Sequence, residues 1–388
     1  MKHTRTAIAA LLPFCALGLA NAQEGVTKDT IYLGTSLPLS GPVAPACVPQ
    51  NDGAQAWFKQ VNAAGGIYGR KIENTVLDDG YKAPEALANA RELASKPILA
   101  FFSGCGSIQP PGILPIATQN GIPYLYPNAG TPELMTAKIS FALLPTYGQI
   151  FENLIQHLIK TEGGKARVYA VLADVPGAQQ AVDGLTKSSM EAGGEFVGSV
   201  VMNPAATDYT PVVLKMKDTH PDYVVTNLSG GAAARLFNAM ASNNAYPAKS
   251  VIGSPVHATM SFLQPVGNAA NGKILVGIPI ASPGDPRAKT CIDAINKFSP
   301  NLPIDFASLW GCAVAQVTTT ALTEVGANPT RAGLIKVLEG WRGKVASPLF
   351  PPITFGGPSR LGISSMFYVG VRDQKLIPAG EYQLTPAR

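Results

Sequence analysis

The chain has 388 residues, of which 46% are hydrophobic and only 14% are charged, and its formal net charge is +5. This length is enough for two lobes with separate hydrophobic cores. So small a positive charge favours neither nucleic acid nor an anionic membrane surface as a partner.

The first predicted element is a secretory signal peptide over residues 1–22. Lys2 and Arg5 precede an apolar run that ends at Ala20-Asn21-Ala22, which has the small residues of a cleavage site. A membrane anchor is the alternative, but the run is short for a bilayer and Pro13 interrupts it. Cleavage after Ala22 would leave 366 residues with a net charge of +3, because the segment removes two bases and no acid. We therefore expect a periplasmic protein.

Four cysteines remain after cleavage: Cys47, Cys105, Cys291 and Cys312. An even number in an oxidising compartment predicts two disulfides, for which four cysteines allow three pairings. The sequence has no CxxC motif, so neither a redox motif nor a structural zinc site is indicated, and we expect no metal.

Short apolar strands alternate with helices along most of the chain. The predicted strands are residues 30–35, 71–78, 98–102, 122–126, 167–172, 195–201, 223–226 and 250–252. The predicted helices are residues 52–63, 84–95, 148–160 and 178–192, one from about 209 and one after 230. Beyond residue 283 come helices at 285–298, 306–325 and 330–339, then strand-like pieces at 353–355 and 366–371. Such alternation predicts an α/β fold with parallel, doubly wound sheets, and the number of strands favours two of them.

Three predicted loops follow strands of the first half: Ser40–Pro49, Gly104–Pro110 and Pro127–Pro132. In open parallel sheets, ligands bind where loops leave the carboxyl ends of the strands. Loops rich in Gly, Ser, Thr and Asn can present N–H groups and hydroxyls to an anion. The same residues also punctuate ordinary turns, and the spacing alone leaves both interpretations open.

At these residues the chain resembles the branched-chain amino-acid binding proteins of ABC importers, the leucine/isoleucine/valine type. The resemblance is carried by Ile31–Gly34, Pro38–Pro42, Gly53-Ala54, Val61–Ile72, Asp78-Asp79, Ser107, Gln109, Gly121–Pro123 and Thr131–Leu134. It continues more loosely through Asp222–Val225, Gly267–Gly272 and Pro352–Phe355.

The resemblance implies a type I periplasmic binding fold, in which two lobes are joined by three hinge crossings near Pro145, Pro279 and Phe350. Residues 23–145 and 280–350 would form the first lobe, and residues 146–279 and 351–388 the second. A ligand would be trapped between the lobes by hinge closure, without a catalytic step or a cofactor. The expected partners are a small molecule and the permease subunits of an ABC transporter, and the expected state is a monomer.

The resemblance also implies a set of ligand-binding residues. In the first lobe these are Gly106, Ser107, Asn128, Ala129 and Thr131, whose hydroxyls and N–H groups would hold a carboxylate. Candidates elsewhere are Tyr147 at the first crossing, and Asp174, Ser229 and His257 in the second lobe. For Ser107, Asp174 and His257 the plainer alternative is a helix cap, or for His257 a surface residue.

One departure from the family pattern bears on the ligand. Amino-acid binders of this type place a second-lobe carboxylate against the ligand's ammonium, and Pro255 stands at that position here. An ammonium buried without an anionic partner costs several kcal/mol. We therefore predict a small carboxylate, aromatic acids included, ahead of a branched-chain or other amino acid, and urea or a short amide third.

The resemblance also suggests a disulfide pairing. The family's usual partner for a cysteine near 105 falls at Tyr81, so we predict Cys47–Cys105, in adjacent loops beside the ligand. Cys291 and Cys312 would then join two neighbouring helices.

Two other classes of function are alternatives: a secreted hydrolase and a ligand-sensing module. A secreted hydrolase lacks support, because GxSxG and HExxH are absent and His157, His220 and His257 are widely separated. The adjacent pair Asp78-Asp79 would point to opposite faces of a strand, which suits paired-carboxylate chemistry poorly. A ligand-sensing module that serves a receptor uses the same closure as an importer component, so the sequence does not separate those two.

Overall fold

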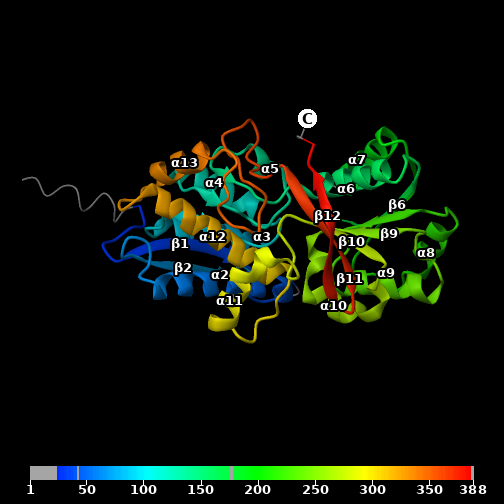
Figure 1. Ribbon diagram of the computed structural model, residues 1–388, viewed down its shortest axis with the longest axis horizontal. Coiled ribbons are helices and arrows are strands. Elements are labelled where there is room, and N and C mark those ends of the chain that lie inside the picture. Colours follow the sequence, from blue (N-terminus) through cyan, green and yellow to red (C-terminus); the bar gives the residue numbers. More distant parts are fainter. Residues whose placement is uncertain (1–23, 42, 175–177, 386–388) are drawn as a thin grey trace, which may run out of the picture.

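The computed structural model describes residues 24–41, 43–174 and 178–385, and the predicted signal peptide lies outside these ranges. Two α/β lobes lie side by side, each built on its own sheet (Figure 1). The predicted fold class is confirmed. None of the helices in the described ranges is long and apolar enough to cross a membrane.

The first lobe contains a five-stranded parallel sheet in the order β2-β1-β3-β4-β5. Its strands are β1 (Thr30–Leu37), β2 (Lys71–Asp78), β3 (Ala100–Phe102), β4 (Tyr124–Leu125) and β5 (Ser140–Phe141). The helices between them are α2 (Ala44–Ala63), α3 (Ala83–Ser95), α4 (Pro110–Asn120) and α5 (Pro132–Thr136). A later part of the chain returns here with α11 (Lys289–Phe298), α12 (Phe306–Val325) and α13 (Arg331–Gly340), and α12 packs along α2.

The second lobe contains a seven-stranded sheet in the order β12-β11-β10-β9-β8-β6-β7. The parallel strands are β6 (Arg167–Ala173), β7 (Glu195–Met202), β8 (Tyr223–Thr226), β9 (Ser250–Gly253) and β10 (Ile274–Ile278). An antiparallel pair, β11 (Ser365–Arg372) and β12 (Lys375–Gln383), completes the sheet. The helices are α6 (Tyr147–Thr161), α7 (Ala178–Glu191), α8 (Thr210–Lys217), α9 (Gly230–Ser242) and α10 (Met260–Val266), with short 3₁₀ turns η1 (Pro255–Ala258), η2 (Gly267–Ala270) and η3 (Pro286–Ala288).

Helix α2 begins at Ala44, eight residues earlier than predicted, so most of the predicted loop Ser40–Pro49 is helical. The start at residue 52 was predicted because proline commonly signals a turn. Pro45 lies in the first turn, however, where an N–H group has no partner within the helix anyway. The early start places Cys47 and Gln50 on a rigid helix rather than on a loop.

The third crossing lies later than predicted. Residues 351–364 were assigned to the second lobe, but the Ala142 N–H donates to Arg360 O (3.0 Å) and the Gly362 N–H donates to Ala142 O (2.8 Å). These hydrogen bonds form an isolated bridge between Ala142 and Leu361, just after the edge strand β5 of the first sheet. The chain therefore enters the second sheet only at β11.

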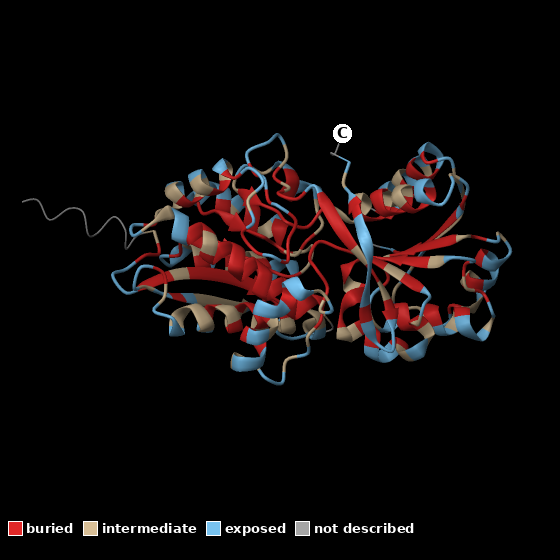
Figure 2. Ribbon diagram, in the orientation of Figure 1, coloured by how far each residue is buried: buried red, intermediate tan, exposed pale blue. Residues whose placement is uncertain are grey.

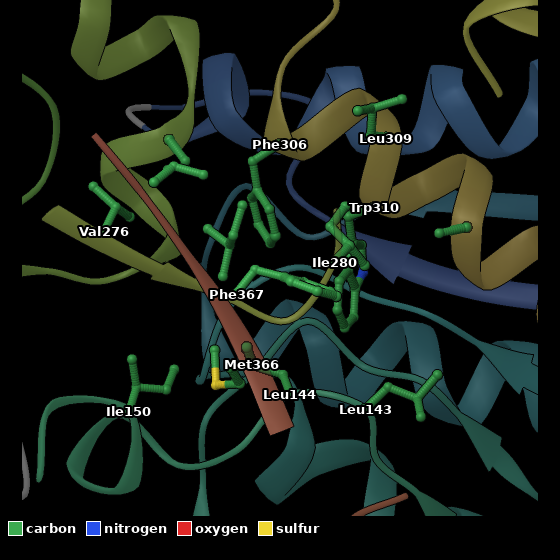
Figure 3. Close-up of a cluster of buried hydrophobic side chains, with 14 of the residues drawn as sticks. Leu143, Leu144, Ile150, Val276, Ile280, Phe306, Leu309, Trp310, Met366 and Phe367 are labelled. Carbon is green, nitrogen blue, oxygen red and sulfur yellow. The ribbon is translucent and has the colours of Figure 1, made fainter. Parts of the chain in front are cut away.

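Buried residues fill the central strands and the inward faces of the helices, while exposed residues lie on the outer helix faces, the loops and the edge strand β12 (Figure 2). One buried cluster lies where the crossings meet, and it draws side chains from both lobes (Figure 3). We call it the crossing cluster; its labelled members are Leu143, Leu144, Ile150, Val276, Ile280, Phe306, Leu309, Trp310, Met366 and Phe367. The crossing cluster therefore forms a hydrophobic core that the two lobes share.

Helices α2 and α12 approach each other closely at two glycines. A Cβ atom on Gly53 would lie 2.0 Å from Ser308 O, and one on Gly311 would lie 1.8 Å from Gln50 O. Real Cβ atoms do not come so near a carbonyl oxygen, so the backbones fit together only because both positions lack a side chain.

We expect Gly311→Ala to lower the free energy of unfolding by about 1–3 kcal/mol, because the added methyl group overpacks this crossing. Gly340→Ala is the matched control: a Cβ atom there meets nothing within 4 Å, and alanine is the better helix former. Urea unfolding of the two variants measures the difference. Equal stabilities would contradict the close crossing.

Candidate functional site

Three residues at the carboxyl edge of the first sheet have left-handed backbone conformations although they are not glycine. Tyr81 (φ 59°) follows β2, Ser103 (φ 56°) follows β3 and Tyr126 (φ 52°) follows β4. Such conformations cost free energy and persist only where surrounding contacts fix them, often at functional sites. This edge is therefore the first candidate for a binding site.

The buried side chain of Gln50 fixes two of these loops. Its Nε2 donates to Ser103 Oγ and to Gly104 O, both at 2.8 Å, and its Oε1 accepts from Asn128 Nδ2 at 2.7 Å. The loop after β3 and the loop after β4 are thus joined through one residue of α2. Asn128, predicted to contact a ligand, holds the loops together in this arrangement.

The buried carboxylate of Asp79 is hydrogen-bonded to residues at the same edge of the first sheet. It accepts hydrogen bonds from Ser36 Oγ (2.9 Å), the Tyr81 N–H (2.9 Å) and Gln109 Nε2 (3.2 Å). Burial raises the pKa of Asp79, and these hydrogen bonds oppose the shift. Gln109 Nε2 also donates to Cys105 O (2.9 Å), which connects Asp79 to the loop after β3.

Both disulfides have the predicted pairing. Cys47–Cys105 joins the start of α2 to the loop after β3, with 5.7 Å between the Cα atoms. Cys291–Cys312 joins α11 to α12, with 5.8 Å between the Cα atoms. The first disulfide fixes the wall of the candidate site, and the second fixes the helices behind it.

Ser107 lies beside two tyrosines that come from different lobes. Burial raises the pKa of Tyr147 to about 12; the neighbouring Tyr81 adds to the shift and a hydrogen bond with the Ser107 side chain opposes it. Burial also raises the pKa of Tyr81, and the nearby Ser107 backbone opposes that shift. Because Tyr147 begins α6 of the second lobe, this group spans the two lobes.

The other predicted first-lobe residues surround this group. Gly106 (φ +113°) has room for no side chain, because a Cβ atom would lie 2.5 Å from Tyr81 Cε2. Ala129 is buried. The hydroxyl of Thr131 is buried and has no hydrogen-bond partner among the described residues. An unpaired buried hydroxyl is costly, so Thr131 is a candidate to donate to a ligand, as are the hydroxyls of Tyr124 and Tyr126, which also have no partner in the part of the chain that the structure describes.

Two predicted residues of the second lobe lie at the corresponding edge of their sheet. Asp174 is exposed directly after β6, and its N–H donates to Met202 O (2.8 Å). Ser229 is exposed at the N-cap of α9, where its side chain makes no capping hydrogen bond. Asn227 fixes the strand ends beside them, since its Oδ1 accepts from the Ala173 N–H (2.7 Å).

His257 lies inside the second lobe and is fully buried. Its Nδ1 accepts from the Ser254 N–H (3.1 Å) as part of the cap of η1, and its ring contacts Phe262 edge to face at 4.8 Å between centroids. Burial lowers the pKa of His257 to about 4, and backbone hydrogen bonds with Ser254 and Leu228 oppose the shift. In this arrangement the imidazole is a neutral helix cap.

The second-lobe loops offer few charges to a ligand. Residues 227–230 and 254–259, which follow β8 and β9, contain no acid. A nearby acid, Asp305, is buried and accepts a hydrogen bond from the Met260 N–H. Among the described residues, no group of three or more His, Cys, Asp or Glu side chains could hold a metal ion.

Sequence reasoning missed two residues of the site, Gln50 and Tyr81. Gln50 lies between the predicted loop Ser40–Pro49 and the predicted helix 52–63, so neither pattern assigns it a role. The family resemblance marks Tyr81 only as the place of a missing cysteine and gives no role to its aromatic side chain. A polar residue on the apolar face of a helix, as Gln50 is, was the available signal.

The comparisons with known proteins agree with this architecture. A family profile described as "Periplasmic binding protein" matches residues 30–375. The Leu/Ile/Val-binding protein BraC3 of Rhizobium johnstonii is 23% identical over 334 residues, which are 84% of this chain and 87% of that protein. A fatty acid ABC transporter substrate-binding protein from Thermomonospora curvata has a TM-score of 0.80 at 22% identity, covering 93% of this chain and 94% of its own. An ABC transporter solute-binding protein from R. palustris, in complex with benzoate, has a TM-score of 0.77 at 19% identity, covering 92% and 98%.

We expect His257→Ala to lower the free energy of unfolding by about 2–4 kcal/mol at pH 7.5, because it leaves a cavity and an uncapped turn. The deficit should shrink as the pH falls from about 6.5 to about 4. In that range His257 of the wild type takes up a proton in the unfolded state but not in the folded state, because its pKa is lowered by folding. The wild type therefore loses this part of its stability as the pH falls, whereas the variant, which lacks the imidazole, does not. Urea unfolding across this pH range measures both effects. A variant as stable as the wild type would contradict the buried role.

Proposed function

We propose a transport role for this chain, which belongs to the periplasmic binding protein family: it is the extracytoplasmic solute-binding component of an ABC importer. The observation that carries the proposal is the arrangement of two α/β lobes whose facing strand ends are rich in hydroxyl and N–H donors. A ligand is captured between the lobes, the lobes close by hinge motion, and the closed form is recognised by the permease subunits. No bond is made or broken in this cycle.

The proposed ligand is a small carboxylate, aromatic acids included. Ser107 and Thr131 supply hydroxyl donors for a carboxylate, while Tyr81 and Tyr147 supply aromatic surface. Pro255 and the acid-free loops after β8 and β9 leave an ammonium without a partner, apart from the exposed Asp174. The benzoate complex of the R. palustris protein is in line with such a ligand.

A branched-chain or other amino acid is the second candidate, favoured by the name of the Rhizobium johnstonii relative. In that case Asp174 is the residue to pair with the ammonium. Urea or a short amide is third. A ligand-sensing module for a receptor remains the alternative of a different class, since it would use the same closure. We also propose that the protein is exported to the periplasm with cleavage after Ala22, and that it is a monomer.

Thermal unfolding of the mature protein with benzoate, leucine, valine and urea tests the ligand class. We expect benzoate to raise the melting temperature by several degrees, because a ligand at 100 times its Kd stabilises by about 2.7 kcal/mol. Leucine, valine and urea should leave it unchanged. Stabilisation by leucine or valine alone would overturn the carboxylate proposal and keep the transport role.

Thr131→Val tests the first-lobe wall. We expect benzoate affinity to fall roughly tenfold, because a hydrogen bond to a carboxylate is lost, while stability without ligand stays within about 0.5 kcal/mol, because the hydroxyl has no partner within the described ranges of the chain. Ser140→Ala is the control: its hydroxyl is also buried and unpaired among the described residues, but it lies on the edge strand β5. Calorimetric titration measures both affinities. Equal affinities in the two variants would remove Thr131 from the site.

A further inference from the structure

The N-terminus of α10 in the second lobe is capped by a side chain from the first lobe. Thr259 occupies the N-cap position of α10, but its side chain makes no capping hydrogen bond and its hydroxyl donates to Val256 O at 2.8 Å. The Met260 N–H, at the first helical position, donates instead to Asp305 Oδ2 at 2.8 Å. A helix normally obtains this cap from its own N-cap residue.

Asp305 caps its own helix at the same time. Its Oδ1 accepts from the Ser308 N–H at 3.1 Å, and its N–H donates to Ser308 Oγ at 3.0 Å, which completes a capping box at the start of α12. The residue is only 3% exposed. One buried carboxylate therefore binds the N-termini of two helices, one oxygen to each.

The two helices belong to different lobes. Helix α12 packs along α2 of the first lobe, whereas α10 packs against α9 of the second. The surrounding elements also touch here, because η1 contacts α12 and α10 contacts α2. The hydrogen bond from Met260 to Asp305 thus lies in a contact between the lobes.

We propose that Asp305 is a latch that stabilises the closed arrangement of the lobes, an inference that rests on the hinge closure proposed above. In the closed form the Met260 N–H and Asp305 Oδ2 pair with each other away from water. When the lobes separate, this pair breaks, while Oδ1 keeps its hydrogen bond to Ser308. Apparent affinity depends on the fraction of protein that can close, so the latch strengthens binding without touching the ligand.

Met260→Pro removes the N–H group and leaves Asp305 in place. Proline is tolerated at the first helical position, and Thr259 (φ −113°, ψ 153°) already has a conformation that suits a residue before proline. Met260→Ala is the matched control, since it loses the same side chain and keeps the N–H. Benzoate affinity of the mature proteins is measured by calorimetric titration, and the radius of gyration without ligand by small-angle X-ray scattering.

We expect the proline variant to bind benzoate about tenfold more weakly than the alanine variant, because a hydrogen bond to a charged group is lost only from the closed form. Equal affinities would overturn the latch. If benzoate does not bind the wild type, the proposed ligand fails and the scattering decides: a larger radius of gyration for the proline variant supports the latch, and equal radii overturn it. If the proline variant does not fold, Asp305→Asn, which keeps an oxygen for Ser308, is judged by the same two measurements.

Discussion

The close crossing of α2 and α12 is the constraint on which the rest of the site depends. The glycines at its centre bring two carbonyl groups, those of Gln50 and Ser308, against the facing helix. Both of these residues also act through their side chains. Gln50 joins the loops after β3 and β4, and Ser308 completes the cap in which Asp305 reaches α10. One apolar helix pair therefore positions the wall of the site and the contact between the lobes.

The sequence predicted the architecture well where the signals are local. The alternation of strands and helices predicted two parallel sheets, although it missed β5, β10 and β12. Helix α12 was predicted residue for residue, because its apolar run is bounded by Asp305 and Gly326. Two of the three predicted strand-end loops, Gly104–Pro110 and Pro127–Pro132, do follow β3 and β4 at the carboxyl edge of the first sheet. The disulfide pairing, inferred from the family resemblance, was also correct.

Features set by long-range contacts were not predictable in the same way. Arg360 and Gly362 lie beside the first sheet through hydrogen bonds with Ala142, a residue more than two hundred positions earlier. The buried position of His257 includes an edge-to-face contact with Phe262, and its residue type alone leaves both a ligand contact and a helix cap open. The first turns of α2 are missed because proline commonly signals a turn, although the first turn of a helix accepts it, as Pro45 shows.

The two lobes differ in how their residues are distributed along the chain. Strands β6 to β10 and their helices form one continuous stretch, whereas the first lobe needs α12, whose Thr319 Oγ1 accepts a hydrogen bond from Trp57 Nε1 across 262 positions. A chain that emerges N-terminus first can complete the β6–β10 unit while the first lobe still lacks the helix that covers α2. Contacts so distant in sequence form late, since the long intervening loop must close first. The first lobe therefore begins the chain but is completed only when α12 is available, and the second lobe likewise receives β11 and β12 only from the end of the chain.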